Sequence, residues 1–190
     1  MRKLKLQMQI SVDGYVAGPN GELDWLTWDQ DDQLMQYVND LTDSVDTIVL
    51  GRNMANVFTQ AWEARVQNPQ DKHYFLAKRM VDYKKIFFSK TIKTVEGQNA
   101  AVENGNMKVV IENLKKQNGK DIIVYGGAGF VSSLIKEGLI DEFNFFVNPV
   151  MISTGLRIFD LNDKRQKLSF LSSTPYECGI TVLTYKLNND

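Results

Sequence analysis

Three short apolar runs, at residues 47–50, 86–88 and 122–125, constrain the fold of this chain more than any other feature, because each of them ends abruptly. Runs of this kind are typical of strands that are buried on both faces, as in parallel sheets. Each run ends in glycine or in small and polar residues. The three endings are Leu50-Gly51-Arg52, Phe88-Ser89-Lys90 and Tyr125-Gly126-Gly127. We therefore expect an α/β fold built on a mostly parallel sheet.

The remaining segments complete the expected topology. Apolar residues at helical spacing predict helices at residues 34–41, 54–58, 110–114 and 130–135. Further strands are predicted at residues 4–10, 100–103, 140–150, 166–173 and 178–187. The first of these alternates apolar and polar residues, which indicates a half-buried strand, and the last two form an antiparallel hairpin around Thr174-Pro175. No linker or repeat divides the chain, so residues 1–190 are expected to form a single domain.

Charge and composition exclude several classes of function. The net charge of −1 gives no electrostatic footprint for nucleic acid or for an anionic membrane. The tightest basic groups, Lys78-Arg79 and Lys84-Lys85, are interpreted as solvated ends of a helix and a strand. Polar residues interrupt the apolar stretch at the N-terminus, so it is not a signal peptide, and no segment is long enough to cross a bilayer.

The chain has one cysteine and one histidine. Cys178 cannot form an intramolecular disulfide, which fits a reducing compartment, and we expect it in a strand of the C-terminal hairpin. His73 is alone, which excludes a multi-histidine metal site, and no other residues have metal-ligand spacing. We therefore expect a soluble, cytoplasmic protein without a metal.

The three strand endings are the candidate ligand site. In an open α/β sheet, ligands bind beyond the carboxyl ends of the strands, where these endings would supply backbone amides, two cations and a hydroxyl. The sequence Gly-Gly-Ala-Gly at residues 126–129 matches neither the dinucleotide fingerprint nor the phosphate-loop motif. A plain strand-to-helix turn is the alternative for this cluster. The coincidence of the three endings favours a nucleotide site.

Six motifs, in order along nearly the whole chain, carry a family resemblance. They are Ser11-Val12-Asp13-Gly14-Tyr15-Val16-Ala17, Ile48-Val49-Leu50-Gly51-Arg52 with Met54, Phe88-Ser89-Lys90, Val124-Tyr125-Gly126-Gly127-Ala128-Gly129, Gly138-Leu139-Ile140-Asp141-Glu142, and the segment from Pro149-Val150 through Gly155 to Phe159. With these motifs the chain resembles the dihydrofolate reductase-like superfamily, in particular the branch similar to the C-terminal reductase domain of bifunctional riboflavin-biosynthesis deaminase/reductase proteins. The resemblance implies a three-layer sandwich with helices on both faces of the sheet, and NADPH as the cofactor.

The resemblance also assigns cofactor-binding residues by position. The phosphates on the adenosine side would contact Gly51, Arg52, Asn53 and Met54. The adenine ribose and its 2′-phosphate would face Ser89 and Lys90, and the pyrophosphate would lie on Gly126, Gly127, Ala128, Gly129 and Phe130. Val16 and Ala17 would lie near the nicotinamide, in a loop that closes over it. The charges of Arg52 and Lys90 favour NADPH over NADH.

The catalytic and substrate-binding residues are hypotheses with open alternatives. Asp13 is either a catalytic group beside the cofactor or substrate, or part of an ordinary Asp-Gly turn. In dihydrofolate reductases a carboxylate on the first helix anchors the pterin, which makes Asp32 a catalytic candidate and Asp31 a substrate-binding candidate. Both could instead be helix N-terminal charges. Trp25, with Trp28, could line the substrate pocket or belong to the core.

The predicted function is an NADPH-dependent oxidoreductase that reduces a small pyrimidine or pterin-type heterocycle, resembling 5-amino-6-(5-phosphoribosylamino)uracil reductase of riboflavin biosynthesis. The alternatives are a dihydrofolate reductase and a non-catalytic nucleotide-binding protein. The chain departs from the resemblance at Ser153-Thr154, where relatives usually have glycine, and it shows no clear basic cluster for a substrate phosphate. Related proteins commonly form homodimers. The second face of strand 143–147 could lie in such a contact, or the strand could be central and covered on both sides.

Overall fold

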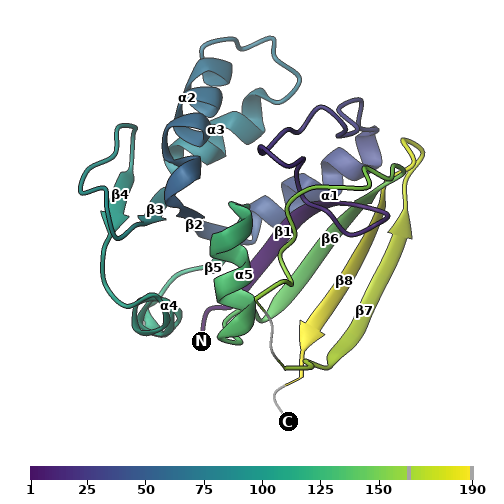
Figure 1. Cartoon of the computed structure of the whole chain (residues 1–190). Helices are drawn as coiled ribbons and strands as arrows, with labels where there is room; N and C mark the ends of the chain where they lie inside the picture. Colours follow the sequence, from purple (N-terminus) through teal and green to yellow (C-terminus); the bar gives the residue numbers. More distant parts are fainter. Residues whose placement is uncertain (162–163, 189–190) are drawn as a thin grey trace.

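The computed structural model describes residues 1–161 and 164–188 (Figure 1). Its strands are β1 (Leu4–Ser11), β2 (Val45–Gly51), β3 (Lys84–Phe88), β4 (Ala100–Glu103), β5 (Asp121–Val124), β6 (Glu142–Asn148), β7 (Leu168–Pro175) and β8 (Thr181–Leu187). Its helices are α1 (Asp32–Asp43), the 3-10 turn η1 (Arg52–Met54), α2 (Ala55–Val66), α3 (Tyr74–Asp82), α4 (Met107–Lys116) and α5 (Ala128–Lys136). Among the described residues, no helix is long and apolar enough to span a membrane.

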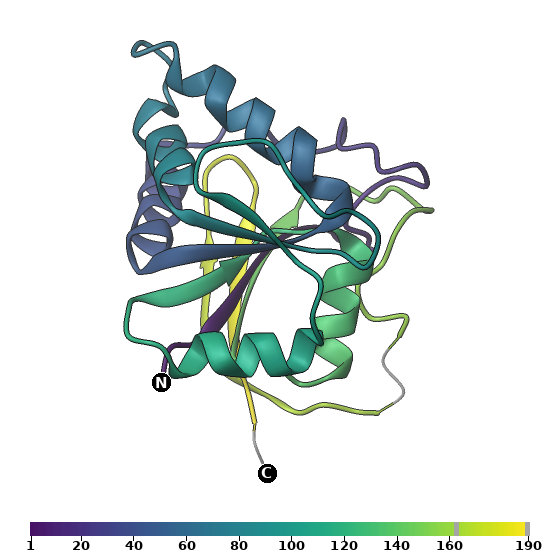
Figure 2. The ribbon, with the colours of Figure 1, turned by 90° about the vertical axis from the view of Figure 1, so that its left-hand side faces the viewer.

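The strands form one sheet in the order β4-β3-β2-β5-β1-β6-β8-β7. The first six strands of the chain pair in parallel, while β8 is antiparallel to β6 and β7 is antiparallel to β8. Figure 2 shows α1, α2 and α3 on one side of the twisted sheet and α4 and α5 on the other. The predicted three-layer α/β fold, with its antiparallel C-terminal hairpin, is confirmed.

Two apolar cores hold the layers together. One lies between the sheet and α4 and α5, and contains Ile111, Val131 and Leu134 from these helices. The other lies between the sheet and α1, α2 and α3, and contains Leu34 and Phe58. The apolar runs that predicted the parallel strands contribute to both cores because successive side chains of a strand point to opposite faces.

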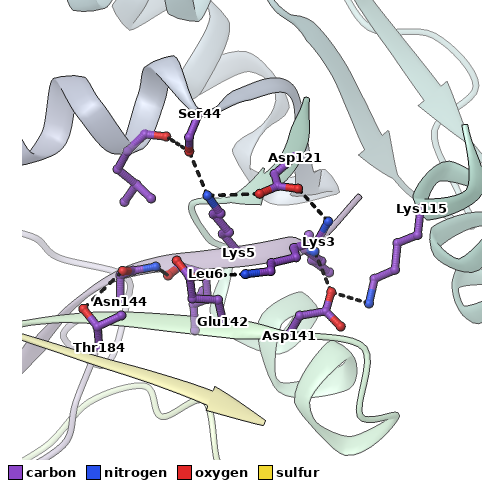
Figure 3. A network of polar contacts seen from close by, with 12 residues as sticks. Lys3, Lys5, Leu6, Ser44, Lys115, Asp121, Asp141, Glu142, Asn144 and Thr184 are labelled. Carbon is purple, nitrogen blue, oxygen red and sulfur yellow. Dashed lines mark hydrogen bonds and ion pairs between the residues drawn. The ribbon is translucent and has the colours of Figure 1, made fainter. Parts of the chain in front are cut away.

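The first strand differs from its prediction, because β1 is central and covered on both faces. Leu4, Leu6 and Met8 are buried in the core beneath α5. The intervening polar side chains point toward α1, and there Lys5 is also buried, donating to Ser44 Oγ at 2.9 Å and pairing with Asp121 at 3.1 Å (Figure 3). The alternation in the sequence therefore marks one apolar face and one internally paired polar face.

The prediction of solvated side chains for the basic pair Lys84-Lys85 is right for Lys84 and wrong for Lys85. Lys84 is exposed, but Lys85 is 2% exposed and donates to the carbonyl oxygens of Met80, Val81 and Tyr83 at 2.7–2.9 Å. Lys85 therefore satisfies the free carbonyls at the end of α3, where a cation is favoured. Burial lowers the pKa of Lys85 to about 8.

The C-terminal hairpin and its neighbour are also shifted from their predicted positions. Thr174-Pro175 belongs to β7, which as an edge strand tolerates a proline that cannot donate a ladder hydrogen bond. The hairpin turn covers residues 176–180, closed by a hydrogen bond from the Tyr176 amide to the Ile180 carbonyl at 2.9 Å, so Cys178 lies in a turn and not in a strand. The strand predicted at 140–150 is β6, which is shorter at both ends.

Strand β6 lies between β1 and β8, and both of its faces are covered. Phe143 and Phe145 belong to the core beneath α5, and Phe146 belongs to the core beneath α1. The structure therefore favours the second of the two alternatives for this strand, a central strand with no free face for a subunit contact.

Candidate functional site

The carboxyl ends of the parallel strands open into a cleft of about 720 Å³. The ends of β2, β3 and β4 and parts of α4 and α5 contribute to its lining. It is lined by Gly51, Arg52, Asn53, Phe88, Ser89, Lys90, Thr91, Glu103, Gly105, Asn106, Met107, Lys108, Gly127, Ala128, Gly129, Phe130, Ser133, Glu137 and Leu156. All three strand endings identified in the sequence thus contribute to one cavity, which has the size of a typical small-molecule site.

The first turn of α5 presents free backbone donors to this cleft. The N-cap residue of the helix is Gly127, and no side chain caps it. Unpaired N–H groups at a helix N-terminus bind anions because the helix dipole favours negative charge there. The turn after β5 therefore has the chemistry of a phosphate site.

Gly129 leaves open space in the cleft. A Cβ atom placed on Gly129 would have no protein atom within 4 Å, and one on Gly127 would meet only the Met54 side chain at 3.8 Å. Packing against the protein therefore gives no reason for glycine at position 129, although glycine weakens a helix. Gly129 is exposed and lines the cleft, so a ligand could approach the backbone closely there.

Gly51 has a different explanation. A Cβ atom on Gly51 would lie 2.8 Å from the Cβ of Phe130, so glycine is needed there for α5 to pack against the end of β2. Phe130 in turn stacks on Phe88, with ring centroids 5.0 Å apart. This stacked pair holds the ends of β2, β3 and α5 together at the base of the cleft.

Cations flank the helix N-terminus. Arg52 follows β2 and Lys90 follows β3, and neither has an ion-pair partner among the described residues. Lys108 of α4 lies 3.7 Å from Glu137 across the cleft. Ser89 is buried, and its Oγ accepts the backbone N–H groups of Thr91 and Ile92 at 3.0 and 2.9 Å. Ser89 therefore shapes the turn that carries Lys90.

The N-terminus of α4 is a part of the cleft that sequence reasoning missed. Gly105, Met107 and Lys108 line the cavity, while the Asn106 side chain caps the helix by accepting the Val109 amide at 3.2 Å. The signal was present, because an asparagine before a helical pattern is a common N-cap. What the sequence did not reveal is that β4 brings this helix beside α5.

Four residues assigned to the cofactor lie outside the lining of the cleft. Val16 and Ala17 are buried, and Ala17 forms an isolated antiparallel bridge with Leu156, which does line the cavity. Met54 packs against the start of the glycine turn, where its thioether sulfur would lie 4.0 Å from a Cβ atom placed on Gly126. Contact between these four residues and a cofactor stays a prediction.

The Asp13 carboxylate is fully engaged with a neighbouring segment. It accepts the Ser11 hydroxyl at 2.7 Å, the Ser153 amide at 2.8 Å and the Ile152 amide at 3.2 Å. These hydrogen bonds, led by the one from Ser11, lower the pKa of Asp13 below its ordinary value. Asp13 is therefore ionised at neutral pH and is a poor proton donor.

Asp31 and Asp32 occupy the start of α1. Asp31 is its N-cap, and its carboxylate accepts the Leu34 amide at 2.9 Å and the Cys178 amide of the hairpin turn at 3.0 Å. These backbone hydrogen bonds lower the pKa of Asp31. Asp32 is exposed in the first turn of the helix. The geometry favours the helix-terminal alternative for both residues.

Trp25 is partly buried, and its indole N–H donates to the Glu22 carbonyl at 3.2 Å, whereas Trp28 is 60% exposed. Trp28 borders a second hollow of about 460 Å³ that also contains Arg65, Lys72 and His73. Its cations are paired, Arg65 with Asp71 at 3.4 Å and Lys72 with Asp29 at 3.6 Å. This hollow has no surplus of positive charge for a substrate phosphate.

A row of carboxamides on β1 and β6 was also missed by sequence reasoning. The Gln7 Oε1 atom is buried with no hydrogen-bond partner, on the face of the sheet that α1 covers. Two residues further, Gln9 Oε1 accepts a hydrogen bond from the side-chain Nδ2 of Asn148 at 2.7 Å, and Asn148 Oδ1 accepts one from the backbone N–H of Thr27 at 3.0 Å. A buried carbonyl without a partner is costly in a folded protein, which makes the free Gln7 oxygen a candidate ligand contact, although Gln7 lines neither of the two hollows.

The fold of this chain is of the dihydrofolate reductase-like class. A dihydrofolate reductase from Enterococcus faecalis, complexed with NADP(H) and RAB-propyl, matches with a TM-score of 0.60 at 15% identity, over 98% of this chain and 97% of that chain. A diaminohydroxyphosphoribosylaminopyrimidine deaminase/5-amino-6-(5-phosphoribosylamino)uracil reductase from Thermotoga maritima matches with a TM-score of 0.68 at 13% identity, over 98% of this chain and 57% of that chain. At these identities the likeness shows the fold.

Sequence comparison gives the family. The chain matches the family described as RibD C-terminal domain over residues 2–182, and it belongs to that family. It is 31% identical over 187 residues to the uncharacterized protein YyaP of Bacillus subtilis (strain 168). The aligned region covers 98% of this chain and 96% of that protein. The predicted membership of the dihydrofolate reductase-like superfamily, in its riboflavin-biosynthesis branch, is confirmed.

Proposed function

We propose that this protein is an NADPH-dependent reductase that transfers a hydride to a small planar heterocycle of the pyrimidine or pterin type. The observation that carries the proposal is the first turn of α5, which has no side-chain cap and has open space at Gly129, between two cations without partners, Arg52 and Lys90. Free amides and flanking cations in one cleft fit the diphosphate and the additional phosphate of NADPH.

Each side of the cleft has a separate part in holding the cofactor. The amides of Ala128 and Gly129 would bind the pyrophosphate. Arg52 would add a bidentate contact to phosphate, and Lys90, held by the Ser89 turn, would provide a point charge for the 2′-phosphate. NADH lacks that phosphate, so the unpaired Lys90 supports NADPH as the cofactor.

When bound, NADPH would supply the hydride from nicotinamide C4. The contribution of the chain would be to orient the two rings and to exclude water from the hydride path, since proximity and orientation can provide a large part of a rate enhancement. Asp13 and Asp31 do not fit the role of proton donor, because hydrogen bonds lower the pKa of both carboxyls, led by the Ser11 hydroxyl at Asp13 and by the Leu34 amide at Asp31.

The carboxamides of β1 support a heterocyclic substrate. A glutamine side chain offers one donor group and one acceptor, which match the adjacent carbonyl and N–H of a pyrimidine or pterin lactam. The unpaired Gln7 Oε1 would then accept a ring N–H. The Asp31 carboxylate already accepts two backbone amides, so the geometry does not favour Asp31 as the pterin anchor of a true dihydrofolate reductase.

Titration of the purified protein with NADPH, followed by nicotinamide fluorescence, tests the cofactor. Absence of binding at sub-millimolar concentrations would overturn the proposal. Oxidation of NADPH in the presence of candidate pyrimidines and pterins tests the reaction. Tight binding without substrate-stimulated oxidation would instead support the alternative of a nucleotide-binding protein without turnover.

A further inference from the structure

The segment that follows β1 lies against the segment that follows β6. These two segments, residues 11–17 and 150–157, leave adjacent parallel strands at the same edge of the sheet (Figure 1). Their backbones pair at both ends. The Val12 amide donates to the Val150 carbonyl at 2.9 Å, and the Val16 amide donates to the Leu156 carbonyl at 2.9 Å.

Between these two backbone contacts, the Asp13 side chain takes the place of the missing backbone pairing. Its two oxygens accept the amides of Ile152 and Ser153, in the middle of the second segment. The Tyr15 ring adds a second contact, because its hydroxyl donates to the Ser153 carbonyl at 3.2 Å and Arg157 lies over the ring at 4.5 Å from its centroid. The backbone N–H and the backbone carbonyl of Ser153 are therefore both held by the first segment.

The backbone at Ser153 needs such support. Ser153 has φ 64°, a left-handed conformation that is unfavourable for residues other than glycine. Two residues later, a Cβ on Gly155 would lie 2.1 Å from the Ala17 carbonyl oxygen, so the two backbones are in close contact there. The hydrogen bonds that the Ile152 and Ser153 amides donate to Asp13 would offset the conformational cost at Ser153 and keep the segment in this close contact.

We propose that Asp13 is a positioning residue of the reductase, and that it holds Ala17 and Leu156 at the end of the cleft where the nicotinamide would lie. The inference rests on the proposed function. Leu156 lines the cleft, and its amide donates to the Ala17 carbonyl at 2.9 Å, so a shift of residues 150–157 would move this wall. Asp13 acts through these residues and not by proton transfer.

Asp13→Asn is the direct test, because asparagine keeps the size of the side chain but has one acceptor oxygen instead of two. Hydrogen exchange of the Ile152 and Ser153 amides reports on the contact without any ligand. We expect exchange at these two amides to accelerate by about tenfold or more. Asp24→Asn, which removes the same charge from an exposed position, should leave it unchanged. Wild-type protection in Asp13→Asn would overturn the inference.

Kinetics separate positioning from proton transfer. In Asp13→Asn we expect kcat for NADPH oxidation to fall by about tenfold while the Kd for NADPH changes much less, and the pH–rate profile should keep its shape. Disappearance of one limb of that profile would identify Asp13 as a catalytic acid or base and would overturn the inference.

Ser153→Gly provides a rescue. Glycine removes the cost of the left-handed conformation, so this variant alone should raise the unfolding midpoint by roughly 2–4 °C. When Asp13→Asn is added to the Ser153→Gly variant, the losses of kcat and of amide protection should be several-fold smaller than when it is added to the wild type. The reason is that the hydrogen bonds to Asp13 no longer have to offset a conformational cost at residue 153. Equal losses in the two backgrounds would contradict the coupling.

Failure of the proposed function has a different signature. If the wild-type protein binds no NADPH, the proposal of a reductase is refuted, and with it the positioning role of Asp13. In that case the exchange experiment would still report whether Asp13 joins the two segments.

Discussion

Replacing Gly129 with alanine distinguishes a phosphate-binding turn from a plain turn between strand and helix. A methyl group there meets no protein atom within 4 Å, so the variant should fold without strain. Alanine is favoured over glycine in a helix by about 0.5–1 kcal/mol. For a chain of this size, the unfolding midpoint should rise by roughly 1–4 °C.

The same methyl group should weaken cofactor binding, because it projects into the space next to the free amides of the α5 first turn. Loss of one charge-assisted hydrogen bond to phosphate costs about 1.5–3 kcal/mol. This corresponds to roughly 10–100-fold weaker NADPH binding. The prediction is therefore a pair of opposite changes, higher stability and lower affinity, measured by thermal unfolding and by nicotinamide fluorescence.

Ser132→Ala on the same helix is the matched control. Ser132 is 3% exposed and its Oγ is buried without a partner, so alanine should stabilise the helix by a comparable amount. Since Ser132 does not line the cleft, NADPH affinity should stay within about twofold of the wild type. If Gly129→Ala binds NADPH as tightly as this control, the glycine turn is structural and the reasoning is refuted.

Four further predictions follow from the site, the buried side chains and the sheet edge. Lys90→Ala should weaken NADPH by about tenfold or more but leave NADH binding unchanged in the same titration, and an equal loss for both cofactors would contradict a 2′-phosphate contact. Gln7→Met should raise the free energy of unfolding by about 1 kcal/mol, since it removes a buried carbonyl without a partner, and should abolish substrate-stimulated NADPH oxidation; full activity would exclude Gln7 from the substrate site. The pKa of Lys85 is about 8 in the folded protein, against an ordinary value of 10.5. Between these two pH values Lys85 keeps its proton in the unfolded chain but loses it in the folded protein. The free energy of unfolding, measured by chemical denaturation, should therefore rise with pH by up to ~3 kcal/mol. The carbonyls around Lys85 oppose this shift, and Lys85→Met should remove the rise. We also propose that the protein is a homodimer that pairs through the edge strand β7, where Phe170 is 62% exposed; light scattering should show a dimer for the wild type and a monomer for Phe170→Asp, and a monomeric wild type would refute this.

Local patterns in the sequence determined much of this protein. Uninterrupted apolar runs predicted β2, β3 and β5, because a strand packed between two apolar layers is commonly apolar on both faces. The glycine cluster after residue 125 and the small or charged residues after Leu50 and Phe88 predicted one edge of the cleft. This succeeded because parallel strands bring their carboxyl ends to the same side of a sheet.

Tertiary structure decided the partners of the polar side chains. The sequence suggested site residues or a local turn and helix end for Asp13 and Asp31, and a solvated strand end for Lys85. In the structure each is bound to a backbone that lies elsewhere in the chain or at the end of a helix. Local pattern cannot show this, since a hydrogen bond to a distant amide depends on how the strands and loops are placed in space. For the same reason, only the structure showed that Gly51 is required by packing while Gly129 leaves room for a ligand.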